Sequence, residues 1–476
     1  MRQRSPWATL AVLALAQFIV VLDVTIVNVA LPDIQADLGF TPETLQWVIS
    51  AYTLLFGGFL LLGGRAADLL GSRRVFIAGL ALFGVSSLVA GLANSSEFLI
   101  AARAVQGLGG ALLSPAALAL LMVTFDHGRD RNIAMGVWGG LAGLGGTLGV
   151  VAGGVLVDAL SWAWVFFVNV PIVVLLIALI PVFVPDHRHG QDGPRTFDTA
   201  GAVLGTAGLL AIVYGVVRAE PSGWASFEVA GFLIGGVVLM VAFVRVEARS
   251  KAPLVPLGLF RSRALSVSSG ALALNGASFL SMFFLTAIYL QQVRGDSALA
   301  AGVHFLPMGG AAVLGAVVAS QLVHRVGTRT VQLAGTVLSL AGLLLLSQAS
   351  ADGSYAVELL PGFILFGFGI IAVAVPAQIA AVSDVERHEA GAASGVVTAV
   401  YQVGGALGLA VVTTLSISHT TDALTQGMSQ QAALVEGFHR GLLVAAAFAV
   451  LNVLVSLATP QLTPDAETVA EAALAA

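Results

Sequence analysis

Long apolar stretches separated by short polar segments cover almost the whole of the 476-residue chain. An α-helix needs about 20 mostly apolar residues to cross about 30 Å of hydrocarbon. The stretches are continuous and do not alternate over strand-length segments, which predicts helices rather than a β-barrel. Fourteen stretches qualify, each with at most one Asp, Glu, Lys or Arg, at approximately residues 7–30, 44–64, 75–96, 98–124, 132–157, 160–184, 199–217, 229–244, 264–290, 298–321, 330–350, 359–382, 391–417 and 441–460. We therefore predict an all-α integral membrane protein with fourteen transmembrane helices.

Charged residues are too rare for a soluble protein of this length. Asp, Glu, Lys and Arg make up 10% of the chain, against roughly 25% in soluble globular domains. The net charge of −5 differs from the basic balance of a nucleic-acid binder. The absence of Cys excludes disulfides, thiolate catalysis and Cys-ligated metal sites. Composition thus excludes an ordinary cytosolic enzyme, a disordered chain and a nucleic-acid binder.

Positive residues fall mainly on one side of the predicted helices. With the N-terminus in the cytoplasm, seventeen Lys and Arg residues lie in cytoplasmic segments, and three lie outside, namely Arg218, Arg294 and Arg440. This asymmetry follows the positive-inside rule and predicts an even number of crossings with both termini cytoplasmic. Since 20 of the 21 basic residues are Arg, and Gly is abundant, the composition suggests a GC-rich bacterial genome. We expect a multi-pass protein of the bacterial plasma membrane.

Two loops of similar sequence indicate an internal repeat. The loop after the second predicted helix and the loop after the tenth align when Gly71 is placed on Gly327, which also places Asp68 on His324 and Arg73 on Arg329. Two halves of six helices, related as parallel repeats, remain when two inserted helices are removed. The predicted units are residues 1–195 as an N-terminal six-helix bundle, 196–246 as two inserted transmembrane helices, 247–263 as a cytoplasmic linker, 264–462 as a C-terminal six-helix bundle, and 463–476 as a mobile C-terminal tail.

Three sequence motifs resemble those of one transporter family. The first predicted helix contains Leu-Asp-Val-Thr-Ile-Val-Asn-Val-Ala-Leu-Pro at residues 22–32, and the fourth contains Leu-Ile-Ala-Ala-Arg-Ala-Val-Gln-Gly at 99–107. The loop between the second and third helices has the pattern Gly-x-x-x-Asp-x-x-Gly-x-Arg-Arg at 64–74. Together these segments resemble the major facilitator superfamily, specifically its fourteen-helix drug:proton antiporter branch. The resemblance implies the fold of this family, with two six-helix bundles and two inserted helices. It also implies proton-coupled export of lipophilic or amphipathic molecules by alternating access.

One departure from the family pattern keeps a second function open. The antiporter branch usually has Gly-Pro-x-x-Gly-Gly in its fifth helix, whereas residues 149–154 read Gly-Val-Val-Ala-Gly-Gly, with Val150 in place of Pro. The alternative is therefore a proton-coupled importer, or an exporter dedicated to one metabolite. An ATP-driven pump is excluded because Lys251, the chain's one Lys, has no Gly-rich P-loop before it. We expect no enzyme activity, no cofactor and no metal.

Asp23 is the carboxylate that lies well inside a predicted helix. An ionised carboxylate there costs on the order of 2.5–3.5 kcal/mol, and protonation relieves that cost. At 1.5 Å per residue, Asp23 lies roughly 10 Å and Arg103 roughly 7 Å from the outer ends of their helices, so the two can pair. The resemblance implies proton coupling at Asp23. A structural acid permanently paired with Arg103 is the alternative, and Arg103 is equally suited to binding an anionic substrate and to holding the helices together.

The loop between the second and third helices is a candidate conformational latch. It contains Gly64, Asp68, Gly71, Arg73 and Arg74. A carboxylate in a loop can cap a facing helix N-terminus, where the helix dipole favours negative charge. The resemblance implies that this helix begins near residue 391 and that the latch favours the outward-facing state, with Asp384, Glu386 and Glu389 available to the arginines. An ordinary positively charged cytoplasmic loop is the alternative.

Small and polar residues inside the helices suggest packing and binding roles. Gly145, Gly149, Gly153 and Gly154 have the spacing that permits close helix approach. A mostly apolar pocket with few charges suits a lipophilic ligand, and its candidate residues are Asn28, Tyr52, Gln106, Asn275, Phe279, Phe283, Tyr289, His304, Gln378 and Gln402. Each of these is also compatible with interhelical packing alone. The expected partners are a small-molecule substrate, protons and the lipid bilayer, without nucleic acid, and we expect a monomer.

Overall fold

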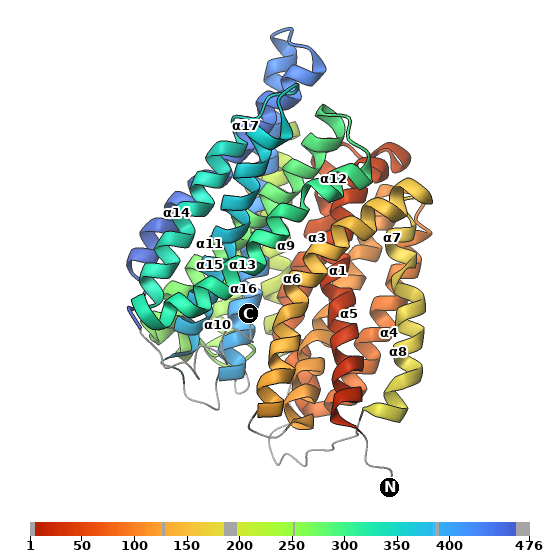
Figure 1. Ribbon diagram of the computed structural model, residues 1–476, viewed down its shortest axis with the longest axis vertical. Helices are drawn as coiled ribbons and strands as arrows, with labels where there is room; N and C mark the ends of the chain where they lie inside the picture. Colours follow the sequence, from red (N-terminus) through yellow and green to blue (C-terminus); the bar gives the residue numbers. More distant parts are fainter. Residues whose placement is uncertain are drawn as a thin grey trace.

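In the residues that the computed structural model describes, the regular secondary structure consists of helices (Figure 1). The structure describes the backbone of residues 5–125, 129–184, 198–250, 253–383, 385 and 390–462. The predicted C-terminal tail, residues 463–476, lies outside this part of the chain. No strand occurs in the described ranges, so the all-α prediction is confirmed.

The helices fall into three groups along the chain. The first comprises α1 (Pro6–Leu38), α2 (Pro42–Leu45), α3 (Trp47–Leu70), α4 (Ser72–Gly91), α5 (Ser96–Thr124), α6 (Arg129–Ala159), α7 (Trp164–Phe167) and α8 (Asn169–Phe183). The second comprises α9 (Thr199–Ser222) and α10 (Phe227–Glu247). The third comprises the short helix η1 (Leu257–Arg261), α11 (Arg263–Ile288), the π-helix η2 (Tyr289–Val293), α12 (Ala298–His304), α13 (Leu306–Val326), α14 (Thr328–Leu346), the π-helix η3 (Tyr355–Leu359), α15 (Leu360–Ser383), α16 (Ala390–Thr425) and α17 (Gln430–Leu457).

The helices match the predicted membrane spans. Among the described residues, thirteen helical segments are long and apolar enough to cross a bilayer. The remaining predicted span corresponds to α6, which is 31 residues long and has an apolar segment at Leu148–Ala159. Large apolar side chains such as Phe227 and Ile234 of α10 are exposed on the surface, which suits contact with lipid. The prediction of fourteen membrane-spanning helices is therefore confirmed.

The first and third groups pack their helices in the same order. In the first group, α1 contacts α6, and α5 contacts both α3 and α4. In the third group, α11 contacts α16, and α15 contacts both α13 and α14. The aligned glycines Gly71 and Gly327 also occupy equivalent one-residue turns, between α3 and α4 and between α13 and α14, with φ of 93° and 81°. These are positive φ values that glycine adopts without steric strain.

The α9–α10 pair lies against the seam between the first and third groups. The two helices pack on each other, and α9 also contacts α3 and α16. Leu54 of α3, Val213 of α9 and Ala406 of α16 belong to one hydrophobic cluster. The Thr414 hydroxyl donates to the Val216 carbonyl at 3.2 Å, which ties α16 to α9. The α9–α10 pair therefore contacts both groups at once.

The two groups share a hydrophobic core at one face of the bundle. We call the face where α1 begins the N-terminal face, at the bottom of Figure 1, and the other the opposite face. At the opposite face, Ile26 and Val150 belong to the same cluster as Phe283 and Phe438. Toward the N-terminal face, separate clusters form within the first group and within the third. Apolar burial thus joins the groups at the opposite face.

Hydrogen bonds reinforce the seam at the opposite face. Gln292 donates to the Gln35 side-chain oxygen at 2.7 Å, and Thr413 donates to the Gln46 side-chain oxygen at 2.7 Å. The Asp158 carboxylate of α6 accepts the backbone N–H groups of residues 298 and 299, at 3.1 Å each. This contact places a negative charge at the first turn of α12, where the helix dipole favours it.

Glycines allow the backbones to approach closely at two places on α6. A Cβ at Gly145, Gly149 or Gly153 would lie under 3.0 Å from atoms of α1, so this stripe packs α6 against the helix that carries Asp23. Gly154 instead faces the backbone of Leu299 in α12. The predicted packing glycines therefore serve both a contact within the first group and a contact across the seam.

Replacing Gly154 by Val is expected to weaken closure of the opposite face. The Val side chain would meet the Leu299 backbone, and overpacking of this kind costs about 1–3 kcal/mol. The fraction of molecules open at that face should rise by about 5- to 150-fold. Because the chain has no native Cys, the measurement is maleimide labelling of an Ala301→Cys reporter, which is buried in α12.

The matched control is Gly310→Val in α13, because a Cβ at Gly310 meets no atom within 4 Å. It should leave the labelling rate unchanged. Equal labelling rates for the Gly154→Val and Gly310→Val proteins would contradict the assigned contact.

Candidate functional site

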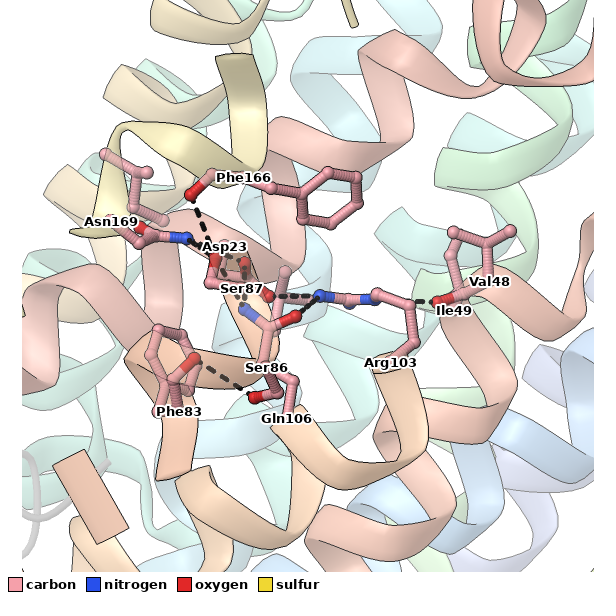
Figure 2. Close-up of polar contacts among 12 residues, drawn as sticks. Asp23, Val48, Ile49, Phe83, Ser86, Ser87, Arg103, Gln106, Phe166 and Asn169 are labelled. Atoms are coloured by element: carbon pink, nitrogen blue, oxygen red, sulfur yellow. Dashed lines mark hydrogen bonds and ion pairs between the residues drawn. The ribbon is translucent and has the colours of Figure 1, made fainter. Parts of the chain in front are cut away.

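Asp23 and Arg103 form a fully buried ion pair inside the first group of helices. The Arg103 Nη1 atom lies 2.5 Å from the Asp23 Oδ2 atom, and the two side chains are 1% and 0% exposed. Asp23 comes from α1 and Arg103 from α5 (Figure 2). The two residues that the sequence identified at matching depth are therefore in direct contact.

The Asp23 carboxylate accepts hydrogen bonds from three side chains. Besides Arg103, Gln106 of α5 donates to Oδ1 at 2.8 Å, and Asn169, the first residue of α8, donates to Oδ1 at 3.0 Å. Ser87 of α4 accepts from both amides, at 3.3 Å from Gln106 and 3.0 Å from Asn169. These contacts provide the partners that a buried charge needs.

Arg103 has a second set of partners on its other side. Its Nε donates to the Val48 carbonyl of α3 at 3.0 Å, and its Nη1 also donates to the Gln106 side-chain oxygen at 2.7 Å. Its guanidinium carbon lies 4.3 Å from the centre of the Tyr52 ring and 5.7 Å from that of Phe166. Cation–π contacts of this kind stabilise a desolvated arginine. The positive charge therefore keeps several partners besides Asp23.

The predicted cavity residues occupy several separate places. Tyr52 and Gln106 belong to the Asp23 network, as described above. Other members make contacts within their own group: Asn28 donates to the Val24 carbonyl, Asn275 to the Ile370 carbonyl, and Tyr289 to the Ser350 carbonyl. Phe279, Phe283 and His304 belong to a chain of ring contacts that continues through Phe305, Phe363 and Tyr355.

Gln378 and Gln402 are half-buried on α15 and α16, and Gln402 faces Gly57 of α3 across the seam. A groove of about 670 Å³ opens at the opposite face, between Pro32, Gln35 and Gln292. None of the ten predicted cavity residues lines this groove. The assignment of the ten residues to one substrate cavity therefore stays a prediction.

The candidate latch is described only in part. Gly64 lies in α3, Gly71 forms the turn to α4, and Arg73 and Arg74 lie in the first turn of α4. The side chain of Asp68 lies outside the described residues, as do Asp384, Glu386 and Glu389. The latch contacts therefore stay a prediction.

Sequence reasoning missed Asn169 and Ser87. Asn169 lies within the predicted span at 160–184, and a polar side chain inside a span is the criterion that selected Asn28 and Asn275. That criterion could have identified it. Ser87 carries no comparable signal, because a serine in a helix can bond to the carbonyl four residues earlier in its own helix.

The comparisons with known proteins agree with the fold. The sequence model of the Major Facilitator Superfamily matches residues 13–409, and the chain belongs to this family. It is 42% identical over 447 residues to the puromycin resistance protein pur8 of Streptomyces alboniger, covering 93% of this chain and 88% of that protein. It is 40% identical over 408 residues to the cephamycin export protein CmcT of Amycolatopsis lactamdurans, covering 85% of this chain and 84% of that protein.

A third relative is the tetracenomycin C resistance and export protein of Streptomyces glaucescens, 36% identical over 417 residues, covering 88% of this chain and 77% of that protein. Among solved structures, a bacterial homolog of the human lysosomal transporter Spinster superposes with a TM-score of 0.68 at 14% identity, covering 96% of this chain and 98% of that one. This likeness shows the transporter fold.

Removing Arg103 is expected to destabilise the protein strongly. Arg103→Met leaves the Asp23 carboxylate buried without its countercharge, and breaking a buried pair in this way costs about 3–5 kcal/mol. Asp23→Asn in the same chain should restore much of that loss because it removes the unpaired charge. Thermal unfolding of the four proteins of this double-mutant cycle in detergent provides the measurement.

Arg218→Met is the matched control, since Arg218 pairs with Glu228 at 2.9 Å but both side chains are more than a third exposed. Exposed pairs contribute about 0–1 kcal/mol. If the losses of stability caused by the Asp23 and Arg103 substitutions were strictly additive, the two residues of the buried pair would not be energetically coupled.

Proposed function

We propose that this protein exports lipophilic or amphipathic small molecules in exchange for protons, by alternating access. The observation that carries the proposal is the buried Asp23–Arg103 pair and its network. Support comes from the relatives, which carry the names of antibiotic resistance and export proteins. A multi-pass transporter with such relatives fits the bacterial plasma membrane, with both termini in the cytoplasm.

The partners of Arg103 make protonation of Asp23 physically acceptable. When Asp23 takes up a proton, the guanidinium loses its countercharge. It keeps the Val48 carbonyl, the Gln106 oxygen and the Tyr52 ring. Both protonation states of the acid therefore leave the arginine with partners.

Proton exchange needs a change in helix packing, because Asp23 is fully buried in this conformation. The network joins α1, α4, α5 and α8, so a rearrangement of these helices during alternating access would open the acid to water. In the proposed orientation the opposite face is extracellular. The joined cores at that face then correspond to a state closed to the outside.

The proton gradient supplies enough free energy for export against a concentration gradient. One proton moving inward through about 100 mV releases roughly 2.3 kcal/mol, and each pH unit adds about 1.4 kcal/mol. The transport unit in this proposal is one chain. Its two moving bodies are residues 1–195 and 264–462, with 196–246 as an insert and 247–263 as a linker.

An exporter dedicated to one metabolite, or an importer, is the second candidate. The observation that favours it is Val150, which stands where the antiporter branch has Pro. Its carbonyl lies 2.5 Å from where a Cβ on Gly302 would be, at the seam between α6 and α12. In the proposed mechanism, the missing Pro therefore lies at a contact that would change during alternating access.

Transport into inverted membrane vesicles tests the proposal, with puromycin, lincomycin and a lipophilic cationic dye as probes. With the vesicle interior made acidic, the wild-type protein should accumulate at least one probe, and collapse of the gradient should stop accumulation. Asp23→Asn should abolish gradient-driven uptake, because it removes the group that exchanges the proton.

The matched control is Asp37→Asn, an acid on the same helix that accepts a hydrogen bond from Trp162 at 2.7 Å. It should keep most of the uptake. Accumulation that ignores the gradient, or full uptake by the Asp23→Asn protein, would reject proton antiport at Asp23. Uptake of a single probe would favour the dedicated exporter, and gradient-driven loss of probe from the vesicles would favour the importer.

We also propose that Asp68, Arg73 and Arg74 form a latch that favours the outward-facing state. Asp68→Asn should then shift the population toward opening at the N-terminal face. A Leu61→Cys reporter, beside Gly395 across the seam, should label faster with maleimide in the Asp68→Asn protein. Asp352→Asn, in the loop after α14, is the control, and unchanged labelling for Asp68→Asn would count against the latch.

A further inference from the structure

The surroundings of the Asp23 carboxylate consist of hydrogen-bond donors. Arg103 donates to Oδ2, and Gln106 and Asn169 donate to Oδ1. This arrangement suits the ionised acid, which only accepts hydrogen bonds. A protonated acid carries an O–H group as well, and a buried O–H without an acceptor costs about 1–3 kcal/mol. An exchangeable proton on Asp23 therefore needs a neighbour that can become an acceptor.

Two of the three neighbours cannot take that role. A guanidinium has no acceptor atom. Gln106 has an amide oxygen, but that oxygen accepts from Arg103 Nη1 at 2.7 Å. Turning this amide would point its N–H groups at the guanidinium and lose the bond. Arg103 and Gln106 are therefore fixed as donors to Asp23.

Asn169 differs from Gln106 in one respect. Its side chain is fully buried, and its Oδ1 atom has no hydrogen-bond partner among the described residues. Its Nδ2 atom donates to Asp23 and to Ser87, both at 3.0 Å. Turning this amide about its Cβ–Cγ bond would bring the unpartnered oxygen toward Asp23. The oxygen gives up no hydrogen bond in this turn, because it accepts none from the described residues.

We propose that Asn169 is the positioning residue that stabilises Asp23 in both protonation states. This inference rests on the proposed proton coupling. With Asp23 ionised, the Asn169 amide nitrogen donates to the carboxylate. When a proton from water binds the carboxylate, the amide turns and its oxygen accepts the new O–H.

The hydroxyl of Ser87 assists both orientations of the amide. It now accepts from Asn169 and donates to the Phe166 carbonyl at 2.9 Å. After the turn it faces the amide oxygen, to which a hydroxyl can donate instead. Because Asn169 begins α8 directly after α7, proton arrival changes the hydrogen bonds at the corner between these helices.

Infrared difference spectroscopy of the full-length protein in detergent, recorded over a pH series, tests the inference. Protonated Asp23 should give a carboxylic C=O band that is absent from the Asp23→Asn protein. In Asn169→Leu the O–H loses its acceptor, so the band should move to higher frequency. Asn169→Ser should give the same shift, because its hydroxyl is too short to reach the acid, and it replaces Asn169→Leu if that protein does not fold.

Asn452→Leu is the matched control. Asn452 is also buried, with a side-chain oxygen that lacks a partner among the described residues, and its amide donates to the Ala271 carbonyl at 3.1 Å. It should leave the Asp23 band in place. A band at the wild-type frequency in both Asn169 variants would overturn the role of Asn169 while leaving proton coupling standing. An Asp23-dependent band that never appears at any pH would instead reject the proton coupling on which the inference rests.

Discussion

The constraint on which this structure depends is a carboxylate held away from water inside a helix bundle. A buried charge is tolerated only when it is paired and its remaining lone pairs accept hydrogen bonds. Asp23 meets this condition through Arg103, Gln106 and Asn169, which come from α5 and α8. The same set of contacts reaches α4 through Ser87 and α3 through the Val48 carbonyl. One acid thus fixes the relative positions of five helices, and a change in its protonation bears on all of them.

Charge is distributed unevenly between the first and third groups of helices. In the described part of the third group, the buried polar side chains are all neutral, for example Asn275, Gln332 and Asn452. The seam at the opposite face is held by apolar packing, by neutral amides and by Asp158 at the start of α12. In the proposed mechanism, therefore, the proton binds within one group and the motion takes place between the two groups.

The sequence predicts the fold well because the bilayer imposes a simple rule on it. Each span must be long, apolar and helical, so counting such stretches is sufficient, and even the shortest, at 229–244, corresponds to the 21-residue helix α10. The pairing of Asp23 with Arg103 was also accessible, since helical rise gives the depth of each residue. Gly71 and Gly327, aligned from a weak repeat, share their turn geometry.

Other parts of the site depend on how each helix is rotated, which hydropathy does not determine. Asn169 reaches Asp23 because the short helix α7 sets the start of α8, a corner that lies inside one continuous apolar stretch. The predicted cavity set stays a prediction for a related reason. A polar side chain inside a helix can donate to its own helix backbone, as the Asn28 amide nitrogen does to the Val24 carbonyl four residues earlier. From the sequence alone, such a residue looks the same as one that faces a cavity.

The central claim is that substrate and proton move in opposite directions through one protein by way of Asp23. Its most direct measurement uses purified protein in liposomes that contain a pH-sensitive dye, with a transported probe added on one side and no pH gradient imposed. We expect the probe gradient alone to drive protons the opposite way, and this proton flux to disappear in the Asp23→Asn protein. Probe movement without proton movement in the wild-type protein would contradict the account.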